Sequence, residues 1–207
     1  MSPRRRDAEG TTSARAERRA ELLAAAAQVF AERGYTATTV REVADAAGIL
    51  GGSLYYHFDS KESMVEEILS TFLDDMWAGF DRILAAGLGA RETLEALVAE
   101  SFRCIDVYRP AVVIYQKESR YLAATWERFG YLAESWRRHQ EMWLGLIERG
   151  IAEGEFRSDL DPALIYRFIR DAVWVAASWY QPGEKLPAEE VGTQYLSIVL
   201  EGIQATT

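Results

Sequence analysis

Residues 38–64 read TTVREVADAAGILGGSLYYHFDSKESM, a spacing of capping, apolar and glycine residues that predicts two short helices joined by a tight turn. Thr39 followed three residues later by Glu42 is typical of a capping box at the start of a helix. Gly48 supplies the left-handed backbone position that ends this helix. One apolar face of the helix is expected to consist of Val40, Val43, Ala44 and Ala47.

The second short helix is expected from about Leu50, with Leu54 and Phe58 buried. Its other face is polar and aromatic, where a purely structural helix would carry Lys and Glu. Such a face suits phosphates and base edges, so the pair of helices is interpreted as a helix-turn-helix DNA-binding unit. The outward residues are Ser53, Tyr55, Tyr56 and His57.

The string SLYYHFDSKE at residues 53–62, at its distance from Gly34 and Gly48, resembles the DNA-binding domain of the TetR family of bacterial one-component repressors. Gly51-Gly52 departs from the family pattern, in which many members carry larger or charged groups. Fewer side chains then reach bases at the start of the recognition helix. On this resemblance we expect DNA contacts from Thr39, Arg41, Gly52, Ser53, Tyr55, Tyr56, His57 and Lys61.

Charge is distributed unevenly along the chain. The net charge of −9 argues against nucleic acid as a partner, yet residues 1–61 carry nine Arg and Lys against eight Asp and Glu, and the remainder carries 14 against 24. The acidity therefore belongs to the C-terminal part. The first segment holds a basic cluster of Arg4, Arg5, Arg6, Arg15, Arg18 and Arg19.

This cluster has two interpretations, contact with a phosphate backbone or minor groove and a solvated tail, and sequence alone leaves both open. We expect a flexible basic arm over residues 1–14, a helix-turn-helix domain over 15–61 and an effector-binding and dimerisation domain over 62–207.

The lone cysteine, Cys104, excludes an intramolecular disulfide and provides no metal-ligand spacing, so we expect a small buried hydrophobe and no metal site.

The arginines near the N-terminus precede no apolar run of signal-peptide length, and no segment approaches the roughly 20 apolar residues of a transmembrane helix. The expectation is a cytoplasmic protein without membrane contact.

Helical spacing of apolar residues recurs along the whole chain, and no strand alternation is found. Ser60 or Asp59 is expected to cap the connector between the two domains, and Asp161-Pro162 to open a later helix. Pro110 is expected to end one helix or begin another. With the two helices above, an all-α fold of about nine helices is predicted, the others at residues 15–33, 60–84, 94–108, 110–120, 125–153, 162–181 and 187–203.

The last two helices are too apolar for their outer faces to meet solvent. Packed against symmetry mates they would form an isologous four-helix interface, and the TetR resemblance implies such a homodimer. The alternative is a monomer that buries these faces internally. The residues concerned are Leu164, Phe168, Ala172, Val175, Ala176 and Trp179, then Val191, Tyr195, Leu196, Ile198, Val199 and Ile203.

A polar strip interrupts the apolar helix that begins at Pro162 and comprises Arg167, Arg170, Asp171, Trp174 and Ser178. One interpretation is structural: an Arg167–Asp171 ion pair and Arg170 stacked on Trp174, both at i,i+4. The other is an anion-binding patch beside an aromatic wall, suited to an acidic ligand with an apolar body. Helix geometry does not decide between them.

Segments in both domains also resemble a narrower group, actinobacterial TetR-type repressors that govern degradation of the last two rings of cholesterol. This resemblance implies an effector that is the CoA thioester of a bicyclic indanedione propionate, and it favours the anion-binding interpretation. We expect ligand contacts from Arg170, Trp174, Arg167, Tyr115 and Gln116. The resemblance is carried by residues 48–55, 112–116, 166–171, 174, 179–180, 194–196 and 198–200.

A homodimeric, ligand-responsive repressor is therefore expected, with operator DNA and an acyl-CoA effector as partners and no cofactor. An enzyme is disfavoured because His57 lies in the DNA motif, His139 in a charged stretch, and no catalytic constellation or phosphate loop is present. Two alternative functions would use the same ligand pocket. One is a TetR-type repressor for another hydrophobic or acyl-CoA ligand, and the other is an acyl-CoA sensor or carrier that does not bind DNA. A purely architectural DNA binder would leave the aromatic core unexplained.

Overall fold

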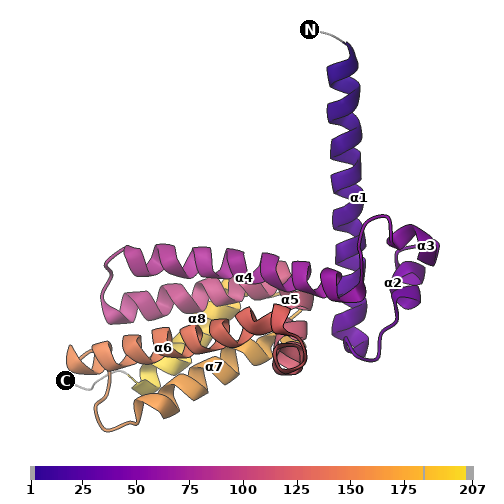
Figure 1. The fold of residues 1–207 in the computed structure, drawn as a ribbon. Helices are drawn as coiled ribbons and strands as arrows, with labels where there is room; N and C mark the ends of the chain where they lie inside the picture. The colour runs from indigo at the N-terminus through magenta and orange to yellow at the C-terminus, as the bar shows by residue number, and fades with distance from the viewer. Residues whose placement is uncertain (1–2, 184, 204–207) are drawn as a thin grey trace. The chain divides into compact units, whose positions relative to one another are not determined.

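The computed structural model describes the backbone of residues 3–183 and 185–203 and the side chains of residues 15–183 and 185–202. Over these residues the chain is all-α, as predicted, and has no β-strand (Figure 1). The helices are α1 (Pro3–Arg33), α2 (Val40–Ala46), α3 (Gly51–Leu54), α4 (Lys61–Ala85), α5 (Ala90–Thr125), η1 (Glu127–Phe129), α6 (Gly130–Ala152), α7 (Pro162–Trp179) and α8 (Ala188–Ile203).

The chain divides into two compact units, residues 1–70 and 71–207, with α4 contributing to both. In the first unit α2 packs on α1 and α3 packs on α2. The helix predicted over residues 15–33 begins earlier, since α1 starts at Pro3 and includes the segment expected to be a flexible arm. The side chains of Arg4 to Arg6 lie outside the described residues.

The caps read from the sequence are present in the structure. Ser63 N–H donates to Ser60 Oγ at 3.1 Å, so Ser60 rather than Asp59 caps α4. Leu164 N–H donates to Asp161 Oδ1 at 3.0 Å, and Pro162 follows at the first helical position of α7. Gly48 adopts φ +66°, the left-handed conformation expected at its helix end.

The second unit is a bundle in which α5 contacts α6, α7 and α8 (Figure 1). Two predicted helices, 94–108 and 110–120, are joined in α5 through a kink at Tyr108, where φ is −120° and ψ is 25°. This fusion is the reason that eight α-helices replace the nine expected over the described residues. Pro110 has no N–H for the helical ladder, which accounts for the kink.

The helix expected from about Thr125 begins five residues later, at Gly130. The backbone of Trp126 is extended (φ −136°, ψ 128°), and its ring packs edge-on against Tyr121 at 5.7 Å. A short 3-10 turn then leads into α6. The helical conformation is therefore interrupted at Trp126, so that α5 and α6 are separate helices.

The core of the second unit is apolar and aromatic. Cys104 is fully buried there, as predicted, burial raises the pKa of its thiol to about 12, and its sulfur accepts a hydrogen bond from the Arg103 guanidinium at 3.6 Å. Within the described residues no helix is long and apolar enough to cross a bilayer.

Candidate nucleic-acid interface and ligand pocket

The capping box holds the start of α2 in the first unit. Glu42 N–H donates to Thr39 Oγ1 at 3.3 Å, and Thr39 N–H donates to Glu42 Oε2 at 2.8 Å. The hydrogen bond from the Thr39 backbone is the largest cause that lowers the pKa of Glu42. Arg33 adds an ion pair to the same carboxylate at 2.8 Å. The predicted contact residues Thr39 and Arg41 are both exposed at this end of α2.

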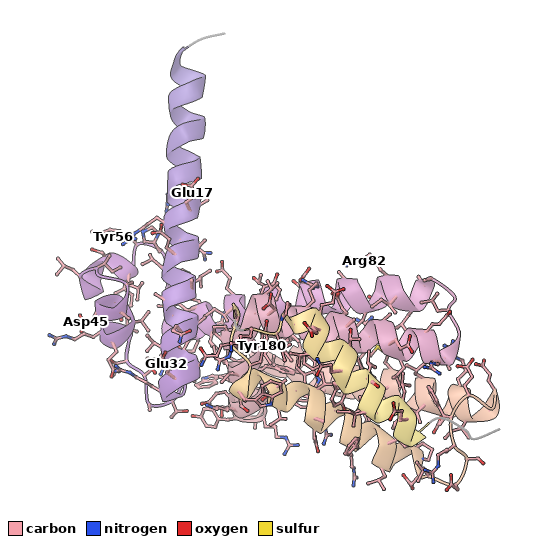
Figure 2. All side chains as sticks on the ribbon, turned by 180° about the vertical axis from the view of Figure 1, so that it is seen from behind. Glu17, Glu32, Asp45, Tyr56, Arg82 and Tyr180 are labelled. Atoms are coloured by element: carbon pink, nitrogen blue, oxygen red, sulfur yellow. The ribbon has the colours of Figure 1, made fainter. Side chains whose placement is uncertain are left out.

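The residues of the predicted recognition face lie in and directly after the short helix α3, in the part of the first unit where Figure 2 labels Tyr56. Leu54 and Phe58 are buried, as predicted, while 57% of Tyr55 and 82% of Tyr56 is exposed. Ser53 and His57 are half-buried. The exposed aromatic pair therefore dominates this face.

Three further positions of this face, residues 50–52, lie at the start of α3. Leu50, which sequence reasoning did not select as a contact residue, is 81% exposed. A Cβ built on Gly51 or Gly52 would meet no atom within 4 Å, so packing does not require glycine at either position. The start of α3 therefore carries no side chains at these two positions, which would allow a DNA duplex to approach the backbone closely.

Lys61, which is predicted to contact a flanking phosphate or base, also has a structural role within the first unit. Its ammonium donates to the carbonyl oxygens of Tyr35 at 2.9 Å and Thr38 at 2.8 Å, and it lies 4.3 Å from the centre of the Tyr35 ring. Two of its three hydrogens are therefore committed to holding the loop between α1 and α2.

Part of the predicted basic cluster is also neutralised internally. Arg19 forms a two-pronged ion pair with Glu67 and lies 4.5 Å from the centre of the Phe58 ring. Arg18 pairs with Glu21 at 2.6 Å. Arg19 links α1 to α4, whereas the Arg18–Glu21 pair lies on the exposed surface of α1. Both pairs leave fewer cations of the cluster for a phosphate backbone.

A cavity of about 310 Å³ lies in the second unit, within the size range of small-molecule sites. It includes four of the five predicted ligand residues, because Tyr115, Gln116, Arg170 and Trp174 all line it. Arg167 is exposed and does not line it. The lining consists of Met76 from α4, Tyr115 and Gln116 from α5, Trp136 and His139 from α6, and Arg170, Asp171, Trp174 and Val175 from α7.

Aromatic rings form the walls of this cavity. Tyr115 and Trp136 are stacked, with ring centres 5.3 Å apart and an interplanar angle of 11°. Phe72 meets both Tyr115 and Trp174 edge-on, at 5.9 and 6.4 Å. Burial raises the pKa of Tyr115 to about 12, so its phenol stays neutral. An apolar ring system of a ligand would find a complementary surface here.

On α7, the contacts of the polar strip differ from both that the structural interpretation described, the Arg167–Asp171 ion pair and the Arg170–Trp174 stack. Arg170 pairs with the adjacent Asp171 at 2.7 Å, and its guanidinium lies 5.2 Å from the centre of the Tyr166 ring. Among the described side chains, Arg170 makes these contacts in place of the Trp174 stack, and Asp171 pairs with Arg170 in place of Arg167. The Arg170–Asp171 pair is the charged part of the cavity lining.

A second hollow of about 600 Å³ adjoins the cavity through two shared lining residues, Trp136 and Arg170. Its lining also contains Arg120 and Arg137. Arg137 is paired with Glu134 and Glu141. A mostly aromatic chamber thus borders a hollow that carries three arginines.

Sequence reasoning did not select five of the lining residues as ligand contacts: Met76, Trp136, His139, Asp171 and Val175. His139 is 5% exposed, and its Nε2 accepts a hydrogen bond from Trp143 Nε1–H at 3.0 Å. Burial, and then the charge of Arg170, lowers the pKa of His139 to about 3, so the ring is neutral near pH 7. The available signal was spacing: positions 136, 139 and 143 share one face of a helix.

The first unit thus has a helix-turn-helix, and the second contains an aromatic-lined cavity. The chain belongs to the TetR family: the family described as "Bacterial regulatory proteins, tetR family" matches residues 22–68, and "Tetracyclin repressor-like, C-terminal domain" matches residues 87–203. Proteins of this family are transcription regulators that bind operator DNA as dimers and respond to small molecules.

Individual relatives match over nearly the whole chain. The HTH-type transcriptional repressor KstR2 of Rhodococcus jostii is 55% identical over 93% of this chain and 94% of its own. KstR2 of Mycobacterium tuberculosis is 50% identical over 90% of this chain and 92% of its own. The solved structure of that ketosteroid transcriptional regulator aligns with a TM-score of 0.87, covering 91% of this chain and 96% of the other.

Proposed function

We propose that the protein is a homodimeric repressor that leaves its operator when it binds the CoA thioester of a bicyclic, steroid-derived ring fragment. The observation that carries the proposal is the chamber in which Arg170 and Trp174 lie beside stacked Tyr115 and Trp136. Similarity to a ketosteroid regulator along nine-tenths of the chain supports a ligand of steroid origin.

The chemistry of the two hollows matches the two ends of such a ligand. The aromatic chamber suits a fused-ring acyl group, since its walls are rings and its volume is that of a small-molecule site. The neighbouring hollow is lined by Arg120, Arg137 and Arg170, and the phosphates of CoA would bind there in competition with the carboxylates that already pair with Arg137 and Arg170. The thioester would then lie near Arg170 and Trp136, the residues common to both linings.

Dimerisation is proposed through the outer faces of α7 and α8. In the single chain Leu164, Phe168, Val175 and Trp179 are each more than half exposed, and Ile198 is 71% exposed. Apolar side chains gathered on two adjacent helices are typical of an interface with a symmetry mate. We expect Phe168→Glu to convert the dimer to a monomer in analytical ultracentrifugation, and an unchanged dimer mass would overturn this assignment.

Repression requires the two helix-turn-helix units of a dimer to match half-sites about 34 Å apart in successive major grooves. Release requires the effector to bind more tightly to a conformation with another spacing. A coupling of about 1–3 kcal/mol changes operator affinity by roughly 5- to 150-fold, which sets the scale of the expected effect.

The test is a fluorescence-anisotropy titration of a labelled operator duplex, with and without the indanedione-propionyl-CoA. The proposal expects specific binding in its absence and release in its presence, with free CoA as the control. Release by a different acyl-CoA alone would identify another TetR-type repressor. Acyl-CoA binding without operator binding would identify a sensor that does not act on DNA.

A further inference from the structure

Leu50 is a large apolar side chain that contributes neither to the core of the first unit nor to the cap of a helix. It is 81% exposed, and among the described large apolar side chains only Tyr56 is more exposed. It occupies the N-cap position of α3, where Ser, Thr, Asp or Asn is usual, and makes no side-chain cap hydrogen bond. A polar residue would suit the fold better here, so the leucine requires another explanation.

The backbone on both sides of this side chain is fixed by hydrogen bonds. Ile49 N–H donates to the Ala44 carbonyl oxygen at 3.0 Å, which closes the turn after α2. The Leu50 carbonyl oxygen accepts from Ser53 N–H at 2.8 Å. The side chain therefore projects from a defined position, which lowers the entropy lost when it meets a partner.

The two residues that follow Leu50 leave it alone at this end of α3. Both are glycines, and a Cβ built on either would meet no atom within 4 Å. A duplex that approaches the start of α3 would therefore meet the isobutyl group of Leu50 before any other side chain of residues 50–52. The first residues of a recognition helix are the ones that contact base edges in the major groove.

The chemistry of the base edges decides what such a side chain can bind. In the major groove the C5-methyl of thymine is the apolar group, and the other groups are hydrogen-bond donors and acceptors. A leucine placed on those donors and acceptors would remove their water without replacing its hydrogen bonds, which is costly. The exposed phenols of Tyr55 and Tyr56 can make the polar contacts of this face, whereas Leu50 can make only an apolar one.

Resting on the proposed function, in which the dimer binds an operator, we propose that Leu50 is a specificity-determining residue that packs on the C5-methyl group of one thymine in each half-site. This contact favours an A·T pair at that position, in the orientation that turns the methyl group toward Leu50. It provides a sequence preference at the point where the two glycines provide none.

The experiment removes the methyl group from the DNA and the isobutyl group from the protein in turn. The probe is a duplex that the wild-type protein selects from a random-sequence library. Each thymine of its half-sites is replaced by deoxyuridine, which keeps base pairing and lacks only the C5-methyl. Fluorescence anisotropy gives the Kd of every duplex for the wild type, Leu50→Ala and Leu50→Ser. Leu84→Ala, which shortens an exposed leucine of the second unit, is the matched control.

We expect deoxyuridine at one position of a half-site to weaken binding of the wild type and of Leu84→Ala by roughly fourfold, which corresponds to the loss of one buried methyl group. Changing both half-sites should weaken it by about 15-fold, since well-separated positions are nearly additive. For Leu50→Ala and Leu50→Ser the ratio at that position should fall to about one, with the other positions unaffected. Leu50→Ser should melt no lower than the wild type, because serine is the better N-cap, so it keeps the test decisive if Leu50→Ala disturbs folding.

Two results would overturn the thymine contact. In the first, no deoxyuridine changes the affinity of the wild type. In the second, every deoxyuridine has the same effect on the wild type and on both Leu50 variants, as expected if the leucine contacts the backbone or wedges between base pairs. Both results leave operator binding intact, whereas a library that yields no specifically bound duplex would overturn the proposed function as well.

Discussion

Gln116 and Trp174 are joined at the cavity of the second unit, where the Gln116 side-chain amide on α5 donates to the backbone carbonyl oxygen of Trp174 on α7 at 2.7 Å. The bond links two lining helices that are more than fifty residues apart in the sequence. Because it ends on the backbone of Trp174, it does not involve the indole, which packs against Phe72 and His139. The wall that presents Arg170 and Trp174 is therefore anchored independently of their side chains.

Arg170→Ala and Trp174→Ala are expected to retain operator affinity without ligand and to need at least tenfold more acyl-CoA for half-maximal release. Arg170 supplies directed hydrogen bonds from a planar fork, and Trp174 supplies an aromatic wall. The measurement is operator anisotropy at increasing acyl-CoA. Arg167→Ala is the matched control, since this exposed neighbour on the same helix does not line the chamber.

A parent-like response of both variants would place the effector elsewhere in the second unit. Joint loss of operator binding and dimerisation would show that the two side chains are structural.

Tyr56→Ala is expected to abolish specific operator binding in a gel-shift titration while leaving the melting temperature within a few degrees. The side chain is 82% exposed, so its removal costs little packing, whereas it stands on the face that would meet base edges or phosphates. Tyr121→Ala, a partly exposed tyrosine in the second unit, is the control for loss of a surface ring. Unaltered operator affinity of Tyr56→Ala would remove this residue from the interface.

Lys61→Met is expected to lower the free energy of unfolding by about 1.5–3 kcal/mol, because hydrogen bonds from a charged donor to the Tyr35 and Thr38 carbonyls are lost. Arg41→Ala, which removes an exposed cation of α2, should leave stability unchanged and weaken operator binding. Urea unfolding compares the two. Equal stability of Lys61→Met and the parent would show that the ammonium contributes nothing to the loop.

Burial of the neutral His139 should make the free energy of unfolding decrease as the pH falls. Its pKa is about 3 in the folded protein against about 6.5 unfolded, so between these values the unfolded chain binds the extra proton. Stability from this residue is thus complete above pH 6.5 and is lost at up to about 1.4 kcal/mol per pH unit below it. Urea midpoints between pH 7 and 4.5 should decline less steeply for His139→Gln, and identical slopes would contradict a buried neutral imidazole.

Local patterns were sufficient for most of the fold. The Thr39–Glu42 box, the Asp161 cap and the positive φ of Gly48 were predictable because each depends on residues within one turn of its own position. The kink at Tyr108 was only half predictable: Pro110 indicates a break, but tertiary packing decides that the helix resumes at once.

The ligand chamber was predictable in part, through Arg170 and Trp174 on one helix. The partner of Arg170 was not predictable, because helical spacing favours pairs at i,i+4, whereas the guanidinium pairs with the adjacent Asp171. The burial of His139 was hidden for a different reason. Its sequence neighbours are charged, and only the packing of α6 against α7 places the imidazole among rings.

The central claim is that occupation of the chamber and operator binding are coupled, and linkage tests it most directly. Operator Kd is measured with and without saturating indanedione-propionyl-CoA, and acyl-CoA Kd with and without operator. Thermodynamic reciprocity requires both Kd values to rise by the same factor, which we expect to be at least tenfold. An operator Kd unchanged by saturating acyl-CoA would contradict the account.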